Sequence, residues 1–455
     1  MKFAIKNRAA CAILVSAAGL FCTGLSLAAI PVQHWTQPGG ARVYLIESPA
    51  IAMVDVQVDV DGGSRRVAAE QAGLAGAMAA LLSKGVAARP GAPAMDENAL
   101  GEAWADLGAQ FGASAGSDRF SFSLRSLTEP DLLQQAVSLA ARQIADPSLP
   151  EAVWQRDRQR LLAQLKESYT RPAYLTARAF SEAVYRSHPY GHEVSEATLA
   201  RISVADMRAF HARYISACNA RVSIVGALTR AQADALVTGL LARLPPRDCA
   251  AVSPLPQVPE VAPLDQARVI RIPFDSAQAH VLLGQPGYKR DDPDFFALTV
   301  GNYVLGGGGF VSRLTEEVRE KRGLSYSVSS YFSPGRHAGA FTLGLQTRPD
   351  QAAQATEVAR QVLARFVAEG PTEVELQAAK ANLIGGFPLL IDSNRKLLGN
   401  LSSMAWNDLP LDYLDSWTAR IAKVGVADVR AAFARKLQPE KMVTVILGAA
   451  PNAPP

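Results

Sequence analysis

Histidine side chains are the most direct candidates for metal binding in this sequence, and their spacing limits where a metal could bind. His188 and His192 are four residues apart, a separation that places two ligands on one face of a helix. Pro189 and Gly191 disfavour a regular helix there, and no Glu lies between the two histidines. We therefore interpret both as structural or surface residues. The six histidines are at positions 34, 188, 192, 211, 280 and 337.

A run of four glycines, Gly306–Gly309, is the second feature whose residue types could do chemistry. Glycine-rich loops bind phosphate when a Gly-Lys-Ser/Thr sequence follows, and bind dinucleotides when the glycines are spaced as G-x-G-x-x-G. This run continues into Phe310 and meets neither requirement. We therefore reject a nucleotide-binding interpretation.

The first 28 residues have the pattern of a secretory signal. Lys2, Lys6 and Arg8 precede a mostly apolar stretch from Ala9 to Leu20, and small residues follow at 26 and 28. We predict export across the inner membrane, to the periplasm, with residues 1–28 removed. The alternative is an uncleaved N-terminal anchor, because the weakly apolar run approaches the roughly 20 residues that span a bilayer.

Charge and cysteine content narrow the class of protein further. Without residues 1–28 the chain has 43 Lys and Arg against 42 Asp and Glu, so its net charge is about +1 and a nucleic-acid partner is not indicated. The exported chain keeps two cysteines, Cys218 and Cys249. The sequence leaves two alternatives open for them, a disulfide or two free thiols.

An internal repeat divides the chain into two halves. The segment VADMRAFHAR (204–213) matches VADVRAAFAR (426–435), 222 positions later, and a hydrophobic strand pattern ending in Gly-Ala follows each copy. Between the halves, the proline-rich segment 251–264 is too rich in proline for a helix or a central strand. We predict an N-terminal domain over 29–250, a linker over 251–264, a C-terminal domain over 265–450 and a disordered tail over 451–455.

Periodicity within each half predicts an α+β unit. Four valines from Val54 to Val60 alternate with polar residues, which predicts a strand with one buried face. Amphipathic helices are expected over Glu151–Glu167 and Gln351–Glu369, and a capping box at Thr372 and Glu375 opens another. The predicted fold is therefore two tandem α+β domains.

The motifs in these two domains resemble a known family. The stretch LGGGGFVSRLTEEVREKRGLSYSVSSYFSPG (305–335) is similar to the second-domain signature of the insulinase, pitrilysin and mitochondrial-processing-peptidase family. The resemblance is weaker but collinear in the first half and covers essentially the whole mature chain. It implies two homologous domains, each a mixed, mostly antiparallel sheet with helices on one face, that close around a peptide. It also implies that the glycine run is a mobile loop bordering the peptide channel; a surface connection without substrate contact is the alternative.

The zinc-binding residues of that family are missing here. Active members carry an inverted motif, His-x-x-Glu-His, in which the histidines bind zinc and the glutamate activates the metal-bound water. The matching positions in GLAGAMAALLSKG (73–85) are Gly76, Ala79 and Ala80, and the third-ligand position holds Gln164. Glycine and alanine offer no side-chain ligand atom. We therefore expect no metal and no catalytic residue on this chain alone.

The second half keeps the residues that the resemblance implies for substrate binding, Arg319 and Tyr326. We expect a helix from Ser312 to Arg322, a left-handed residue at Gly323 and a strand over Leu324–Tyr331, so that Tyr326 lies early in the strand. The alternative is that Arg319 forms a surface salt bridge with Glu316 or Glu320 while Tyr326 is half-buried packing.

The family also uses an edge strand of the first domain to pair with bound peptide. The corresponding stretch is AQFGASAGSDRFSFSL (109–124), with Gly112 where the family usually has Asn. We expect Ser121 to Leu124 to form a strand.

These observations lead to a functional hypothesis with two rivals. The chain is expected to be the non-catalytic, substrate-binding subunit of a heterodimeric zinc metallopeptidase. A partner subunit of the same family would supply zinc and the general base, and peptides or unfolded segments would be degraded in a closed chamber. The first rival is a metal-free scaffold or peptide-binding protein, and the second is an autonomous peptidase with an unrecognised site.

Overall fold

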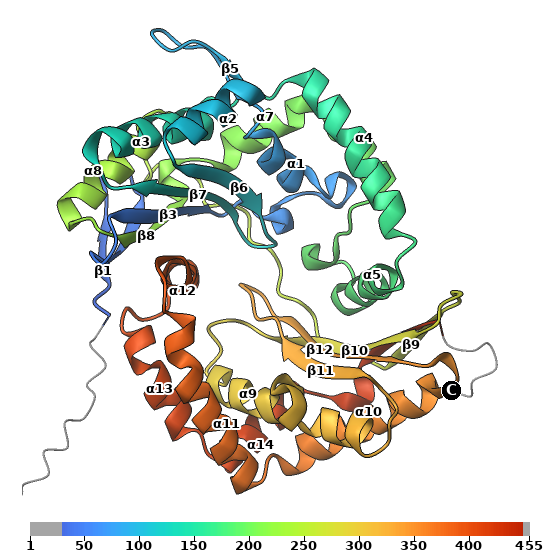
Figure 1. The fold of residues 1–455 in the computed structure, drawn as a ribbon. Helices are drawn as coiled ribbons and strands as arrows, with labels where there is room; N and C mark the ends of the chain where they lie inside the picture. Colours follow the sequence, from blue (N-terminus) through green and yellow to red (C-terminus); the bar gives the residue numbers. More distant parts are fainter. Residues whose placement is uncertain (1–29, 449–455) are drawn as a thin grey trace, which may run out of the picture.

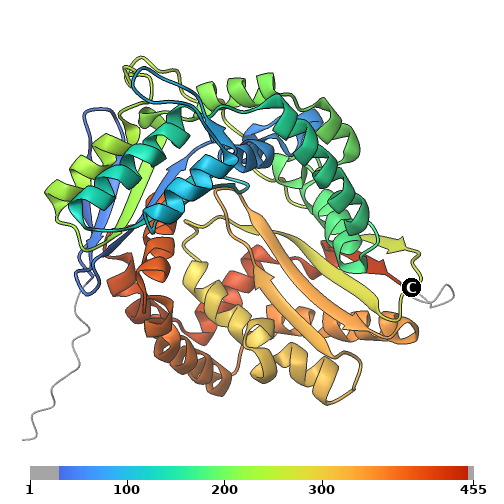
Figure 2. The ribbon, with the colours of Figure 1, turned by 45° about the horizontal axis from the view of Figure 1, so that its top comes forward.

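The computed structural model describes residues 30–448, so the predicted signal (1–28) and tail (451–455) lie outside the described part. Two α+β halves face each other with their sheets inward and most of their helices outward (Figure 1; turned by 45° in Figure 2). Between residues 30 and 448, no helix is both long and apolar enough to cross a bilayer.

The N-terminal half is built on a six-stranded sheet with the order β1-β2-β8-β3-β7-β6. The β2–β8 pair is parallel and the other pairs are antiparallel. Helices pack on its outer face around a core that includes Phe120, Phe122 and Trp154. The strands are β1 (Gln33–Thr36), β2 (Arg42–Glu47), β3 (Met53–Val60), β6 (Gln110–Ala115), β7 (Phe120–Leu127) and β8 (Ala220–Gly226), with a small hairpin of β4 (Gly85–Val86) and β5 (Met95–Asp96). The helices are α1 (Leu74–Leu81), α2 (Glu97–Asp106), α3 (Pro130–Ala145), α4 (Glu151–Ser168), α5 (Pro172–Tyr185), α6 (Glu196–Arg201), α7 (Val204–Tyr214) and α8 (Arg230–Leu241).

The C-terminal half repeats this topology, with strand order β11-β12-β10-β13-β9 and one parallel pair, β13–β9. The prediction of two homologous α+β domains with mixed, mostly antiparallel sheets is confirmed. The strands are β9 (Arg268–Ile272), β10 (Ala279–Tyr288), β11 (Ser327–Phe332), β12 (Gly339–Thr347) and β13 (Val443–Leu447). The helices are α9 (Phe295–Asn302), α10 (Ala352–Glu369), α11 (Glu373–Gly386), α12 (Asn394–Trp406), α13 (Tyr413–Lys423) and α14 (Val426–Lys436), with π-helical turns at Tyr303–Gly307 and Thr315–Glu320.

Each half donates one helix to the inner face of the other half's sheet. Helix α5 packs its Phe180 and Val184 against Val443 of β13, and α12 packs its Leu401 against Tyr44 of β2 (Figure 1). The two helices begin 222 positions apart, so they are equivalent members of the repeat. The expectation that helices cover only one face of each sheet was therefore incomplete, because this exchange covers part of the second face.

The exchange also buries the face of β3 that its alternating sequence indicated as open to solvent. Asp59, on the face expected to be open, is 1% exposed because α12 lies over it. The Ser402 hydroxyl of α12 donates to Asp59 Oδ2 over 2.7 Å and accepts from Arg119 Nη1 and from the Gln57 side chain. A hydrogen-bonded polar cluster therefore joins the two halves, since buried carboxylates need such partners.

Removal of one hydroxyl from this cluster should measure its contribution to stability. We expect Ser402→Ala to lower the free energy of unfolding by about 2 kcal/mol, because Ser402 is fully buried and Asp59 loses a hydrogen bond in a buried setting. Urea unfolding is the measurement. The matched control Ser253→Ala, at an exposed position, should change stability by less than about 0.5 kcal/mol. Equal effects of both substitutions would contradict the proposed role.

Cys218 and Cys249, the two cysteines in the described part of the chain, form a disulfide. Cys218 and Cys249 are joined with their Cα atoms 5.3 Å apart, which decides between the two alternatives that the sequence left open. The bridge connects the turn before β8 to the segment after α8. Gly40 lies against it, and a Cβ at that position would be 2.4 Å from Cys249 Sγ.

Candidate functional site

The positions that the resemblance matches to zinc ligands lie on α1 and α4. Gly76 and Ala80 are exposed on α1, Ala79 is buried, and Gln164 is exposed on α4. A Cβ at Gly76 would meet no atom within 4 Å, so the helix surface has room for a larger side chain there. The residues present do not fit a zinc ion, because Gly76, Ala79 and Ala80 provide no ligand atom. Within residues 30–448, no group of three or more His, Cys, Asp or Glu side chains is arranged to hold a metal.

Of the two histidines, His188 has a structural role. His188 is buried before the 3₁₀ turn Pro189–Gly191, where its Nδ1 accepts a hydrogen bond from the Tyr190 N–H. Its Nε2 lies 3.0 Å from the carbonyl oxygen of Pro259. Both ring nitrogens are therefore engaged by the backbone, which agrees with the structural interpretation.

Arg319 lies on the π-helical turn Thr315–Glu320, and the chain reverses directly after it. Gly323 adopts φ +62°, as the sequence predicted, and its N–H donates to the Arg319 carbonyl oxygen over 2.8 Å. The strand begins at Ser327 rather than at Leu324, so Tyr326 precedes β11 instead of lying inside it. The reason is Ser325, whose hydroxyl donates to the carbonyl oxygens of Ser327 and Gln346 and ties the chain back before the strand starts.

The Arg319 guanidinium lies against two exposed aromatic rings. Its Cζ is 5.2 Å from the ring centroid of Tyr326 and 4.9 Å from that of Phe310. Tyr326 is 82% exposed and Phe310 is 75% exposed, so the alternative that Tyr326 is half-buried packing is wrong. Arg319 Nε also lies 3.4 Å from Glu320 Oε1, a partly exposed pair that contributes little. The structure therefore places Arg319 and Tyr326 together, and adds Phe310, which the sequence analysis did not assign to the site.

The glycine run positions Phe310 through two different properties of glycine. Gly306 lies in the π-helical turn against β11, where a Cβ would be 2.5 Å from the Ser330 nitrogen, so a side chain is excluded by close packing. Gly309 instead has φ +62° with open space around it and turns the chain toward Phe310. The Asn302 side chain secures the turn by exchanging hydrogen bonds with Ser330. The run is therefore a packed turn at its start, and only its end has the character of a loop.

Arg319, Tyr326 and Phe310, together called the Arg319 cluster, adjoin a pocket of about 570 Å³. The glycine turn and Phe310 form one wall, and the outward residues of β11, including Ser327 and Ser329, form the other. Arg319 and Tyr326 lie at this pocket, so a bound chain would pass beside a guanidinium and a phenol. Such groups donate hydrogen bonds to carbonyl oxygens, which suits the backbone of a peptide.

The expected edge strand in the first half is present. β6 (Gln110–Ala115) is the last strand of its sheet, pairs with β7 on one side only, and contacts α1. Ser121 to Leu124 lie within β7, as predicted. A Cβ at Gly112 would come no closer than 3.6 Å to Ser123 Oγ, so glycine is not sterically required at this position.

An ion pair anchors the segment that carries Arg319. Arg313, six residues before it, donates from Nε and Nη2 to the two carboxylate oxygens of Glu375 over 2.6 and 2.7 Å. Glu375 also accepts a hydrogen bond from the Thr372 N–H. The capping box predicted at Thr372 and Glu375 is therefore confirmed. Burial acts to raise the pKa of Glu375, but the hydrogen bonds from Arg313 and Thr372 outweigh it and lower the pKa to about 2.

This lowered pKa predicts a pH-dependent contribution to stability. Because the folded pKa lies below the unfolded value of 4.5, the contribution is complete above that value and is lost as pH falls from about 4.5 toward about 2. We expect Glu375→Gln to cost about 1 to 2 kcal/mol at neutral pH, with solvent screening taken into account. Urea unfolding at several pH values should show the difference from wild type narrowing in acid. A difference that is independent of pH would contradict the ion pair as its cause.

Comparison with known proteins places the whole architecture in one family. The family model described as insulinase, peptidase family M16, matches residues 42–198, and the model described as the peptidase M16 inactive domain matches residues 201–383. A crystal structure of a peptidase M16 inactive domain from Pseudomonas fluorescens superimposes with a TM-score of 0.86 at 33% identity and covers 93% of this chain and 99% of its own.

Relatives known by sequence agree with this assignment. A Mycobacterium bovis protein named as an uncharacterized zinc protease is 28% identical over 423 residues, which are 92% of this chain and 94% of the relative. A Streptomyces coelicolor protein of the same description is 39% identical over 166 residues, 36% of each chain. The chain therefore belongs to the insulinase family of peptidases, as a member that lacks the His-x-x-Glu-His motif.

Proposed function

We propose that this chain is the non-catalytic, substrate-binding subunit of a heterodimeric zinc metallopeptidase. The observation that carries the proposal is the contrast between its two halves. The first half has no ligand side chains at Gly76, Ala79 and Ala80, while the second half presents a half-buried Arg319 and an exposed Tyr326 at a pocket of about 570 Å³. A chain without zinc ligands that keeps peptide-binding residues is suited to be the subunit that holds the substrate while another subunit cuts it.

Arg319 and Tyr326 are suited to binding the peptide backbone. The two aromatic rings hold the guanidinium by cation–π contact, so little side-chain entropy is lost when it donates to a substrate carbonyl. The Tyr326 side chain is exposed at the pocket, which leaves its hydroxyl able to donate to the substrate as well. In the assembled enzyme these donors would stabilise negative charge that develops on the carbonyl oxygen during attack.

The partner in this proposal is a subunit of the same family that carries zinc and the general base. The two subunits would enclose a chamber, and the substrates would be peptides or unfolded segments small enough to enter it. Zinc would bind only to the partner, where it activates the attacking water.

The proposed location is the periplasm. The N-terminal sequence has the pattern of a secretory signal, and the Cys218–Cys249 disulfide suits an oxidising compartment. Mass spectrometry of the mature N-terminus should find it near residue 29. Retention of the leader would instead support an N-terminal anchor.

Co-purification from the native host tests the proposed assembly. The chain should bring down a second family member with an intact His-x-x-Glu-His, and the mixture should hydrolyse peptides while the isolated chain does not. Recovery of the chain alone, with peptide binding but no hydrolysis, would favour the second candidate, a metal-free scaffold or peptide-binding protein. The same Arg319 cluster would serve that function, so the partner decides between the two.

A further inference from the structure

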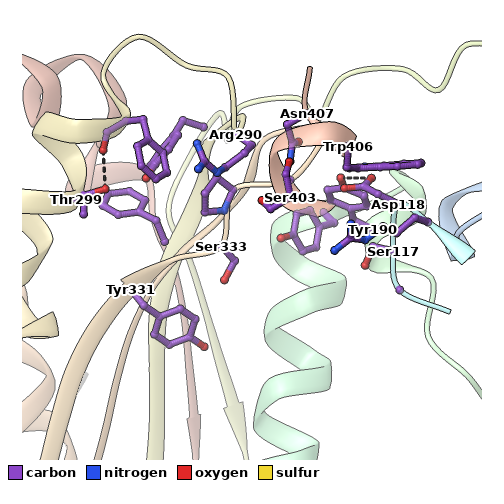
Figure 3. A pocket seen from close by; sticks show the side chains of 18 of the residues that line it. Ser117, Asp118, Tyr190, Arg290, Thr299, Tyr331, Ser333, Ser403, Trp406 and Asn407 are labelled. Carbon is purple, nitrogen blue, oxygen red and sulfur yellow. Dashed lines mark hydrogen bonds between the residues drawn. The ribbon is translucent and has the colours of Figure 1, made fainter. Parts of the chain in front are cut away.

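A second pocket, of about 710 Å³, lies between the two halves of the chain. The N-terminal half contributes the β6–β7 turn and the end of α5. The C-terminal half contributes the ends of β10, β11 and α12 and one side of α9 along its length. Figure 3 shows Arg290 above the centre of this pocket, with Trp406, Tyr190 and Asp118 on one side and Thr299 on the other. Arg319 and Tyr326 do not line it, and neither do the positions matched to zinc ligands on α1 and α4.

This second pocket adjoins the Arg319 pocket. The two share the lining residues Asn302 and Tyr331, so a chain that leaves one can enter the other. The outward side chains of β11 between them are Ser327, Ser329 and Tyr331, which form a continuous surface. At about 3.3 Å per residue, the strand spans about 17 Å, so a peptide of about six extended residues would connect the two pockets.

Arg290 is held in place with donors to spare. Its Nη2 donates to the Tyr413 hydroxyl over 2.8 Å, and its Cζ lies 3.9 Å from the ring centroid of Phe295. Within residues 30–448, Nε and Nη1 of Arg290 make no hydrogen bond. A half-buried guanidinium fixed in this way is preorganised to receive a carboxylate, which it binds with charge-assisted hydrogen bonds.

The other charges that line this pocket leave it positive. Asp118 is fully engaged, because its oxygens accept from Arg65 Nε, from the Tyr190 hydroxyl and from the backbone N–H of Arg336. Arg119 is directed to Asp59 and Ser402. Arg290 is therefore the cation that remains for a ligand.

Aromatic side chains form a large part of the remaining wall. They provide flat apolar surface close to Arg290, which favours a ligand with an aromatic or large apolar group beside its negative charge. Besides Tyr190, these residues are Tyr185, Tyr288, Phe295, Tyr331, Phe332 and Trp406.

We infer that this pocket binds a carboxylate of the peptide, next to an aromatic or large apolar side chain, with Arg290 as the specificity-determining residue. This inference rests on the proposed peptide-binding function and adds a substrate preference to it. The carboxylate can come from the C-terminus of the peptide or from an internal Asp or Glu, since both present the same group.

Three labelled peptides of about ten residues, long enough to span both pockets, separate these sources. The first ends in a free C-terminal Phe, the second is the same peptide with an amidated terminus, and the third is amidated with an internal Asp before the Phe. Fluorescence anisotropy with the full mature chain should show at least one carboxylate peptide binding about tenfold more tightly than the uncharged peptide. The carboxylate peptide that gains affinity identifies the source.

Variants assign the preference to Arg290. Arg290→Gln should abolish the preference, so that the three peptides bind with equal affinity, whereas the matched control Arg348→Gln, at an exposed position, should retain it. Equal binding of all three peptides to the wild-type chain would overturn the inference without any variant, even if Arg290→Gln does not fold. Persistence of the preference in a folded Arg290→Gln protein would also overturn it.

Different binding results would contradict the role of Arg290 and the proposed peptide-binding function. Equal affinity for the three peptides would remove only the role of Arg290. Absence of binding by every peptide, to the chain alone and in the presence of its partner, would remove the peptide-binding function as well.

Discussion

Arg319→Ala should lower the kcat/KM of the assembled peptidase by about 100-fold, without dissociating the subunits. A preorganised donor to a developing oxyanion typically contributes this much. The guanidinium lies against the exposed rings of Phe310 and Tyr326, so under the proposed function its loss would remove a contact to substrate rather than a structural support. Steady-state hydrolysis of a fluorogenic peptide by the reconstituted complex is the measurement.

Matched variants show whether this effect belongs to the site. Tyr326→Phe removes one hydroxyl and should lower kcat/KM by about tenfold, the loss of one hydrogen bond. Arg322→Ala, three residues from Arg319, removes a guanidinium that pairs with Glu317 and should have little effect on turnover. Wild-type turnover in both Arg319→Ala and Tyr326→Phe would eliminate the proposed role of the pair.

Replacement of both disulfide cysteines should give the largest loss of stability among the substitutions proposed here. Cys218 and Cys249 are separated by 31 residues, and a crosslink over such a loop stabilises the folded state by about 3 to 4 kcal/mol by restricting the unfolded chain. We therefore expect Cys218→Ser/Cys249→Ser to lower the free energy of unfolding by that amount in urea under non-reducing conditions.

Reductant provides the internal control for the disulfide. The wild-type chain in excess dithiothreitol should unfold at the urea concentration of the double variant, and the variant itself should not respond to reductant. A change of less than about 1 kcal/mol in the double variant would show that the unfolded chain gains little freedom when the bridge is absent.

The repeat made the two-domain fold predictable, but not the exchange between the domains. The matched segments at 204–213 and 426–435 became equivalent helices, α7 and α14, because local periodicity and capping determine such elements. The packing of α12 on the first sheet depends on contacts such as Leu401 with Tyr44, far apart in sequence. The strand pattern around Asp59 therefore indicated an open face that α12 covers.

Part of the candidate site could also be predicted from the sequence. The left-handed Gly323 and the placement of Arg319 before β11 follow from helix-stop and strand signals in the sequence. Phe310 was missed because its position depends on the fold of the glycine turn, although a large aromatic residue directly after four glycines was a usable signal. The Arg290 pocket could not be predicted, since its walls come from both halves of the chain.

The zinc content and hydrolytic activity of the purified chain, alone and with its partner, test the central claim most directly. Gly76, Ala79 and Ala80 offer no metal ligand, so the account predicts no bound zinc and no hydrolysis by the chain alone. It predicts zinc-dependent hydrolysis once the partner is added. Stoichiometric zinc together with peptide hydrolysis in a homogeneous preparation of the single chain would contradict the account.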